Sequence, residues 1–241
     1  MERNAQVPIP NPWGIAFDEW GQDFFLDTSD PNFRWMLPGS VNAPYGEFTP
    51  NPDNLLERKH MVRPTAGLEF ISSRHFPDEV QGDVLISNCI GFQGTKQHQM
   101  MEVGTEFKSR FSQALVFPKD RNFRPVDMEF APDGSLYLVD WNNMLIGHAQ
   151  HNARDPLRDH SHGRIYRITY PSRPLVKTAK IADASLEELL ENLKLPEYRT
   201  RYRTRRELRG RNADQVLAAV KKWTAKLDNK DVKYEHNLVE A

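Results

Sequence analysis

An internal repeat is the feature that most constrains how this chain of 241 residues folds. Residues 12–28 read PWGIAFDEWGQDFFLDT and residues 125–141 read PVDMEFAPDGSLYLVDW, and the two segments align without a gap. A looser third copy consists of AGLEF at residues 66–70 and GDVLISN at residues 82–88. Each copy is an alternating apolar strand, a turn containing Asp and Gly, and a second strand that ends on a polar residue. Recurrence of such a unit is typical of the blades of a β-propeller.

The repeat predicts a mainly β fold in which residues 1–174 form a partial β-propeller of about three blades. Closed propellers have about four to eight blades, so three blades leave the wheel incomplete. The unpaired edges of such a wheel would be exposed. We therefore expect the chain to be an internal piece of a longer protein or a truncated gene product.

The hydrophobic pattern changes from a period of 2 to a period of 3.6 near residues 171–174. Ser185 and Glu188 form a capping box in front of an apolar helical stripe, and further helices are predicted near Pro196, after Asn212 and around Tyr234. Short helices with brief connections are typical of HEAT/ARM-type arrays, which need about three or more repeats for stability. The sequence thus predicts that residues 175–241 are the start of a small all-α helical array.

Composition excludes several classes of function. The formal net charge of -1 gives no general attraction to nucleic acid or to an anionic membrane. No apolar run is long enough to cross a bilayer, and the first residues, MERNAQVPIPNPWG, lack the pattern of a signal peptide. The single cysteine, Cys89, rules out an internal disulfide and a CxxCH haem site, and we interpret it as a buried thiol. The arginine-rich residues 199–211 are interpreted as a seam between helical repeats and not as a nucleic-acid site.

The densest polar segment is GHAQHNARDPLRDHSHGR, residues 147–164, which follows the clearest repeat. Long polar loops between strands often carry function, since imidazole serves as a general base and arginine binds carboxylates. Three interpretations are open: a catalytic or cofactor-contacting loop, a metal site, or a rigid loop that satisfies its own polar groups. The residues concerned are His148, His151, His160, His162, Arg154, Arg158, Arg164, Asp155 and Asp159.

Aspartates recur at the ends of corresponding predicted strands. Asp27 and Asp140 occupy the same repeat position, and Asp127 lies near the start of its copy. Carboxylates at repeated positions could hold calcium at a channel mouth, but the favoured interpretation is that they accept bonds from backbone amides. The aromatic residues of the repeats are interpreted as packing between blades, because nothing in the sequence supports a sugar-stacking platform. Simple catalytic motifs such as G-x-S-x-G, the P-loop and H-E-x-x-H are absent from a supporting context.

Three segments resemble the membrane-bound dehydrogenases of planctomycete-type bacteria: NPWGIAFDEWGQDFFLDTSD, NFRPVDMEFAPDGSLYLVDWNN and LIGHAQHNARDPLRDHSHGRIYRITYPSRPLV. The similarity runs from about residue 11 to the end of the chain and is most specific at residues 123–170. Proteins of that family look like secreted chains with a propeller similar to soluble glucose/sorbosone dehydrogenases, a HEAT-like array and a c-type cytochrome domain. The order of propeller and helices is the same here.

The resemblance implies a fragment of a quinoprotein-like sugar or alcohol dehydrogenase, periplasmic or exported, and inactive without its missing blades, helical repeats and cytochrome c domain. It implies pyrroloquinoline quinone (PQQ) and calcium as cofactors, with electrons passed to haem c on a domain absent from this chain. By position, the catalytic candidates are His148, His151, His160 and His162, and the cofactor-binding candidates are Arg154, Arg158, Arg164, Asp155 and Asp159. The metal candidates are Asp127 and Asp140. The alternatives are a calcium-dependent hydrolase of the lactonase type and a non-catalytic module that binds carbohydrate or protein.

Overall fold

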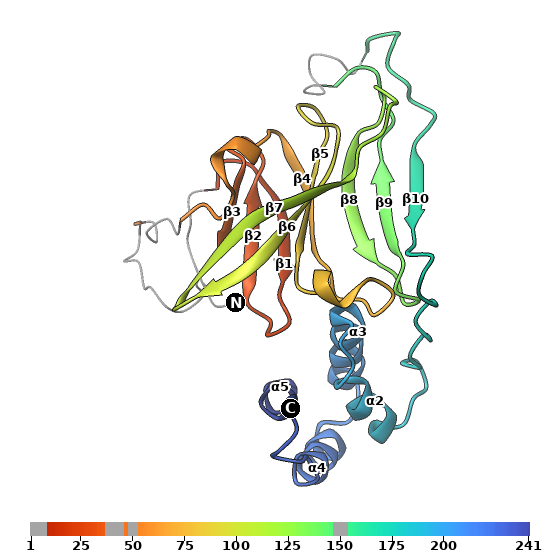
Figure 1. The fold of residues 1–241 in the computed structure, drawn as a ribbon. Coiled ribbons are helices and arrows are strands. Elements are labelled where there is room, and N and C mark those ends of the chain that lie inside the picture. The colour runs from red at the N-terminus through yellow and green to blue at the C-terminus, as the bar shows by residue number, and fades with distance from the viewer. Residues whose placement is uncertain (1–8, 37–45, 48–52, 147–153) are drawn as a thin grey trace. The chain divides into compact units, whose positions relative to one another are not determined.

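The computed structural model describes residues 9–36, 46–47, 53–146 and 154–241, and its architecture is mainly β (Figure 1). The described strands form three separate antiparallel sheets, and in each sheet the strands are hydrogen-bonded in chain order. Each sheet is therefore a meander, in which β9 and β10 are joined by a long loop, residues 141–163. The first sheet contains β1 Pro12–Phe17, β2 Asp23–Asp27 and β3 Asn32–Trp35. The second contains β4 Thr65–Phe70, β5 Val84–Asn88, β6 Gly94–Val103 and β7 Glu106–Val116, and the third contains β8 Pro125–Phe130, β9 Leu136–Asp140 and β10 Arg164–Ile168.

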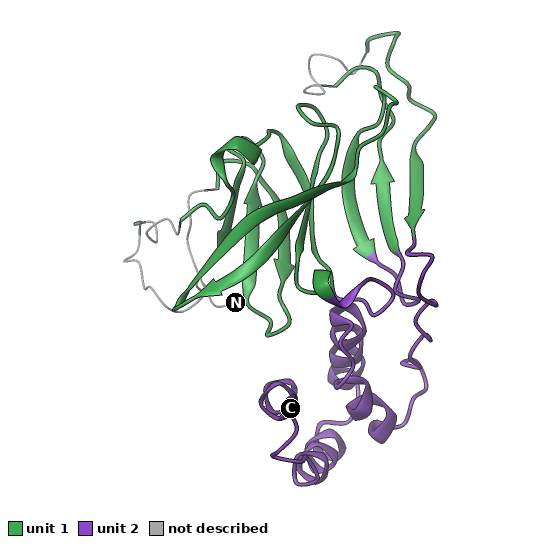
Figure 2. Cartoon of the chain, in the orientation of Figure 1, with its two compact units in different colours: residues 1–71, 79–129, 136–168 green, residues 72–78, 130–135, 169–241 purple. Residues whose placement is uncertain are grey.

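The chain divides into two compact units (Figure 2). Unit 1 holds residues 1–71, 79–129 and 136–168, and unit 2 holds residues 72–78, 130–135 and 169–241. The boundary that the sequence predicts after residue 174 lies inside unit 2. Unit 2 contains the helices α2 Leu186–Asn192, α3 Tyr198–Arg209, α4 Ala213–Thr224 and α5 Tyr234–Glu240, while the 3-10 turns η1 Arg58–His60 and η2 Asp78–Val80 lie near β4 and β5 in the chain.

The sequence repeat is present as a repeat of local structure. Gly21 and Gly134 occupy the same turn position in two copies, and both have a φ of 81°, which favours glycine because it has no Cβ. In both copies the amide after the second strand donates to the carbonyl before the first strand at 2.9 Å, from Thr28 to Asn11 and from Trp141 to Arg124. The prediction that these segments form matching hairpins is confirmed.

The long β6–β7 hairpin and the strand β3 were not predicted from the sequence. The pairing of β6 with β7 shifts register between Thr95 and Lys96 and again between Gln97 and His98. A register shift reverses which side chains face the core, so the simple alternation that marks a strand is lost there.

The first strands of the three sheets lie against one another. A Cβ on Gly14 of β1 would be 3.0 Å from the Cβ of Leu68 in β4. A Cβ on Gly67 of β4 would be 2.9 Å from the Cα of Asp127 in β8. The indole nitrogen of Trp13 donates to the carbonyl of Val126 at 3.1 Å. Glycine at these crossings lets β1, β4 and β8 approach more closely than side chains would allow.

The main core lies between the first two sheets. Phe24 and Phe33 of the first sheet pack with Phe70 of the second, and their rings are 5.2–6.5 Å apart. The β6–β7 hairpin passes across the first sheet and places Phe107 5.1 Å from Phe24 (Figure 1). Each buried phenylalanine contributes about 1.5–3 kcal/mol, so this cluster stabilises the association of the two sheets.

The helix signals predicted from the sequence are confirmed. The Ser185 hydroxyl accepts from the amide of Glu188 while the Glu188 carboxylate accepts from the amide of Ser185, and Asn212 caps α4. Leu190, Leu193 and Trp223 form the buried centre of the helical part. Cys89 is a buried free thiol, as predicted. No described helix combines the length and apolar character needed to cross a bilayer.

Candidate functional site

The predicted site lies in the loop between β9 and β10. His148 and His151 fall outside the described residues. Of the remaining candidates, Arg154, His160 and His162 are exposed, and Asp155, Arg158, Asp159 and Arg164 are half-buried. In the described part of the loop, His160 and His162 are thus open to solvent, whereas Asp155, Arg158, Asp159 and Arg164 are less exposed.

Asp159 and His162 form one compact turn. The Asp159 Oδ1 atom accepts from the amides of Ser161 at 2.9 Å and His162 at 3.1 Å, and Oδ2 lies 2.9 Å from the Nδ1 atom of His162. Hydrogen bonds from Ser161, followed by the interaction with His162, lower the pKa of Asp159 to about 2. An imidazole that donates its Nδ1 proton to a carboxylate keeps Nε2 as a proton acceptor. His162 therefore has the chemistry of an exposed general base.

Arg164 is occupied by groups of the protein itself. Its Nη1 atom donates to the Asp120 carboxylate at 2.6 Å and to the Tyr166 hydroxyl at 3.2 Å. These bonds raise the pKa of Arg164, and hydrogen bonds from Asn122 and Arg164 lower the pKa of Asp120. Arg164 also lies opposite Asp140 in the sheet, 4.0 Å from its Oδ2 atom. Arg164 consequently has less capacity to bind a ligand than its position in the sequence suggests.

The repeated strand-end position caps backbone amides. Asp140 is buried, and its Oδ1 atom accepts from the amides of Arg124 and Asn142 at 2.6 and 2.7 Å. The equivalent Asp27 accepts from the amides of Ser29 and Asp30. In the third copy the position is taken by Asn88, which accepts from the amides of Phe92 and Gln93. These bonds are the ones expected if the repeated aspartates accept from backbone amides, which is the interpretation that the sequence favours.

Asp127, the other metal candidate, is exposed and accepts from the amide of Met128 at 2.9 Å. In the part of the chain that the structure describes, no three histidine, cysteine, aspartate or glutamate side chains gather to hold a metal ion. Asp127 and Asp140 thus gain no third such ligand from the described residues.

Arg124 supports the site and was missed by sequence reasoning. Its buried guanidinium donates to the carbonyls of Asn143 at 2.9 Å, Cys89 at 3.0 Å and Met144 at 3.3 Å. Burial lowers its pKa. The side chain ties the segment after β5 to the segment after β9. Because these carbonyls lie far from Arg124 in the sequence, no local pattern predicts that it binds them.

Unsatisfied polar atoms concentrate at the end of β9. Among the residues with described positions, eight buried side-chain nitrogen or oxygen atoms have no hydrogen-bond partner. Four of these eight lie here: Nε and Nη2 of Arg158, Oδ2 of Asp140 and Oδ1 of Asn142. An unsatisfied buried polar atom costs about 1–3 kcal/mol, so a water or ligand group that paired with these atoms would be stabilised.

The Arg158 guanidinium lies over the Trp141 ring, 5.0 Å from its centroid. A planar guanidinium with two free N–H groups can bind a carboxylate through paired hydrogen bonds, and stacking on an indole fixes its plane. Arg158, stacked on Trp141 and with its Nε and Nη2 atoms unpaired, is therefore the arginine of this loop with spare capacity to pair with a carboxylate.

Comparison with known proteins places the chain as follows. A family model described as a domain of unknown function, DUF7133, matches residues 3–172. No curated protein matches the sequence.

Solved structures of glucose dehydrogenase type show low overall similarity. An oxidoreductase of this type from Thermus thermophilus is 19% identical over 54% of the chain and 38% of that structure, with a TM-score of 0.38. Two further glucose dehydrogenases are 18% and 17% identical over 66% of the chain, with TM-scores of 0.38 and 0.37. The matches cover 40% and 45% of those two structures, so the chain spans less than half the length of each protein.

Proposed function

The chain belongs to the DUF7133 family, and we propose that it is part of a quinoprotein-like sugar or alcohol dehydrogenase. The observation that carries the proposal is the Arg158 guanidinium, which has two buried N–H groups without a partner and lies on Trp141. The segment around it, residues 147–164, also carries the resemblance to dehydrogenases that the sequence shows. The proposal takes residues 1–174 as three neighbouring blades of a propeller, which three meanders with their first strands in contact support.

The donor set at the loop fits PQQ, which is planar and bears carboxylates. Arg158 would bind a carboxylate, Trp141 would support the ring plane, and Arg124 would hold the underlying segments in position. PQQ, when bound, supplies the acceptor for the hydride of the substrate. In this proposal His162, oriented by Asp159, accepts the proton of the substrate hydroxyl, with His148, His151 and His160 as further candidates.

Calcium has less support than PQQ. Asp140 uses Oδ1 to cap two amides, and Asp127 is exposed. Because the described residues bring together no group of three acidic, histidine or cysteine side chains, we derive no step that needs a metal ion.

The proposal extends to parts of the protein beyond this chain. The helices of residues 175–241 would begin a HEAT-like array, and electrons would pass to a c-type haem domain outside this chain. By the same resemblance, the whole protein would be exported to the periplasm.

Arg158→Gln tests the proposed function. PQQ added to the purified chain should quench tryptophan fluorescence, and we expect Arg158→Gln to weaken binding about tenfold or more because a charge-assisted bond is lost. Arg121→Gln is the matched control, since Arg121 is an exposed arginine of unit 1 that lies outside the β9–β10 loop. Circular dichroism should show that both variants are folded.

Equal PQQ binding by the three proteins would contradict the role of Arg158. Activity is then measured on the full-length protein with PQQ, a redox dye and a panel of sugars and alcohols. Turnover of lactones without dye reduction by any sugar or alcohol would overturn the dehydrogenase proposal in favour of the lactonase alternative.

A further inference from the structure

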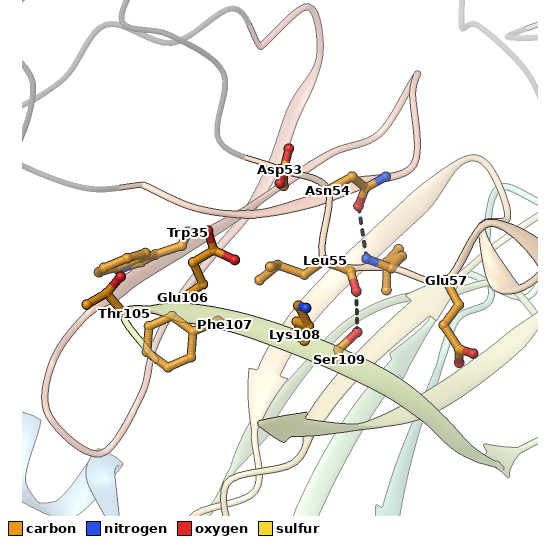
Figure 3. Close-up of a pocket in the computed structure, with 11 residues that line it drawn as sticks. Trp35, Asp53, Asn54, Leu55, Glu57, Thr105, Glu106, Phe107, Lys108 and Ser109 are labelled. Atoms are coloured by element: carbon orange, nitrogen blue, oxygen red, sulfur yellow. Dashed lines mark hydrogen bonds between the residues drawn. The ribbon is translucent and has the colours of Figure 1, made fainter. Parts of the chain in front are cut away.

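A second candidate site lies in unit 1 on residues outside the β9–β10 loop. It is a pocket of about 620 Å³ between residues 53–57 and the first half of β7, with Trp35 at the end of β3 on its wall (Figure 3). Volumes of about 300–1,000 Å³ are typical of pockets that bind small molecules. The pocket is thus large enough for a mono- or disaccharide.

Hydrogen bonds hold both walls of this pocket. The Ser109 hydroxyl of β7 donates to the Leu55 carbonyl at 2.7 Å (Figure 3). The Leu55 amide donates to the carbonyl of Phe33 at 2.8 Å. The Asn54 side chain accepts from the amide of Leu56 at 3.1 Å. Because residues 53–57 are tied to β3 and to β7, the walls are preorganised, which lowers the cost of ordering them on binding.

The lining combines an aromatic platform with carboxylates. Trp35 and Phe107 lie edge to face with their centroids 5.0 Å apart. Asp53 and Glu106 contribute two carboxylates, and Lys108 contributes one ammonium group, whereas the Glu57 carboxylate already accepts from the amide of Phe111 at 2.7 Å. Among the residues that the structure places, the indole N–H of Trp35 is one of the buried polar groups that lack a hydrogen-bond acceptor.

The groups that line the pocket favour some classes of ligand over others. The excess of carboxylates disfavours an anion. An organic cation would suit the rings and carboxylates, but it offers no acceptor for the Trp35 N–H group. A hydroxyl group is both donor and acceptor, so a sugar can donate to carboxylates, accept from the indole and place its C–H face on an aromatic ring.

We infer that this pocket is a binding site for a neutral carbohydrate or polyol. The inference goes beyond the proposed function, because the pocket uses none of the residues assigned to the quinone and binds without redox chemistry. The site would hold a sugar on the same unit as the β9–β10 loop.

The test is calorimetric titration of the chain, without PQQ, with glucose, cellobiose and sorbitol, with tetramethylammonium and gluconate as the cationic and anionic comparisons. We expect at least one neutral probe to bind at about millimolar Kd, and Glu106→Gln to weaken it about tenfold by removing a charged acceptor. Trp35→Phe, which keeps a ring but removes the N–H group, should also weaken binding. Glu79→Gln is the matched control, since Glu79 is exposed and does not line the pocket.

Three results would overturn the inference: no binding of any neutral probe, preference for tetramethylammonium or gluconate, or binding unchanged in both pocket variants. Failure of the proposed function is distinguishable from these results. Arg158→Gln should lose PQQ and keep the sugar, whereas Glu106→Gln should lose the sugar and keep PQQ.

Discussion

His98 shows how a single residue acquires properties that its neighbours in sequence do not suggest. It is only 1% exposed, and its ring packs against Phe111 with centroids 5.7 Å apart. Burial, followed by the positive charges of Lys96 and His60, lowers its pKa to about 4, while Glu57 acts in the opposite direction. Burial also lowers the pKa of Lys96, whose ammonium donates to the His60 carbonyl at 3.0 Å. The neutral form of His98 is therefore part of the folded state.

This burial predicts a dependence of stability on pH. The unfolded chain binds a proton at His98 near pH 6.5, whereas the folded protein does so only near pH 4. The contribution of neutral His98 to the free energy of unfolding is fully present above about pH 6.5. It falls by about 3 kcal/mol in total as the pH drops toward 4. Urea unfolding between neutral and mildly acidic pH measures it.

His98→Gln should reduce the slope of unfolding free energy against pH, because the titrating group is removed. His160→Gln is the control, since His160 is an exposed histidine outside the cluster of His98, Phe111 and Lys96. Equal slopes in wild type and His98→Gln would show that His98 is not the group responsible.

At the scale of the elements, the close approach of β4 and β8 depends on Gly67. A Cβ at this position would lie 2.9 Å from the Cα of Asp127, which is backbone and cannot rotate away. We expect Gly67→Ala to lower the free energy of unfolding by about 1–3 kcal/mol through overpacking. Chemical denaturation followed by tryptophan fluorescence measures the change.

Gly163→Ala is the control for this prediction. Its Cβ would lie 3.6 Å from the carbonyl oxygen of Asp140, an ordinary contact, so a change within about 0.5 kcal/mol is expected. If Gly67→Ala is as stable as Gly163→Ala, the first strands of the second and third sheets do not meet as described.

At the scale of the whole molecule, the helical part of unit 2 depends on a buried ion pair at its C-terminal helix. Arg201 of α3 is fully buried, and its Nε atom donates to the Glu240 carboxylate of α5 at 2.8 Å. Arg205 donates to the same carboxylate at 2.6 Å. The Arg201 Nη1 atom also donates to the carbonyls of Leu195 and Pro196. Arg201 and Arg205 of the arginine-rich segment thus tie α3 to α5, with partners inside this chain and not in further repeats.

Replacing the Glu240 carboxylate should leave the buried positive charge of Arg201 without an opposite charge beside it. We expect Glu240→Gln to destabilise the helical part by about 3 kcal/mol, measured by far-UV circular dichroism in urea. Glu235→Gln on the same helix is the control, because Glu235 is exposed. An unchanged transition for Glu240→Gln would mean that the pair contributes no net stability.

Local patterns in the sequence determined the elements that depend on neighbouring residues. The repeated turns with Asp and Gly and the caps at Ser185 and Asn212 form as predicted, since turn and capping chemistry acts over a few residues. The predicted alternation of buried and exposed residues is found in β8 and β9, whereas β4 and β5 are buried along their whole length. The β6–β7 hairpin escaped prediction because its register shifts disturb the alternation.

Only the tertiary structure decided which distant residues meet. Trp13 reaches Val126 across 113 positions, Arg124 binds carbonyls from the segments after β5 and β9, and the pocket of Trp35 and Phe107 joins β3 to β7. The sequence identifies the charged residues of the β9–β10 loop but does not distinguish them. In the structure, the Nε and Nη2 atoms of Arg158 are buried without a partner, whereas Arg164 donates to the Asp120 carboxylate. Burial and hydrogen-bond partners are properties of the packed chain, because they depend on contacts between segments that no local pattern records.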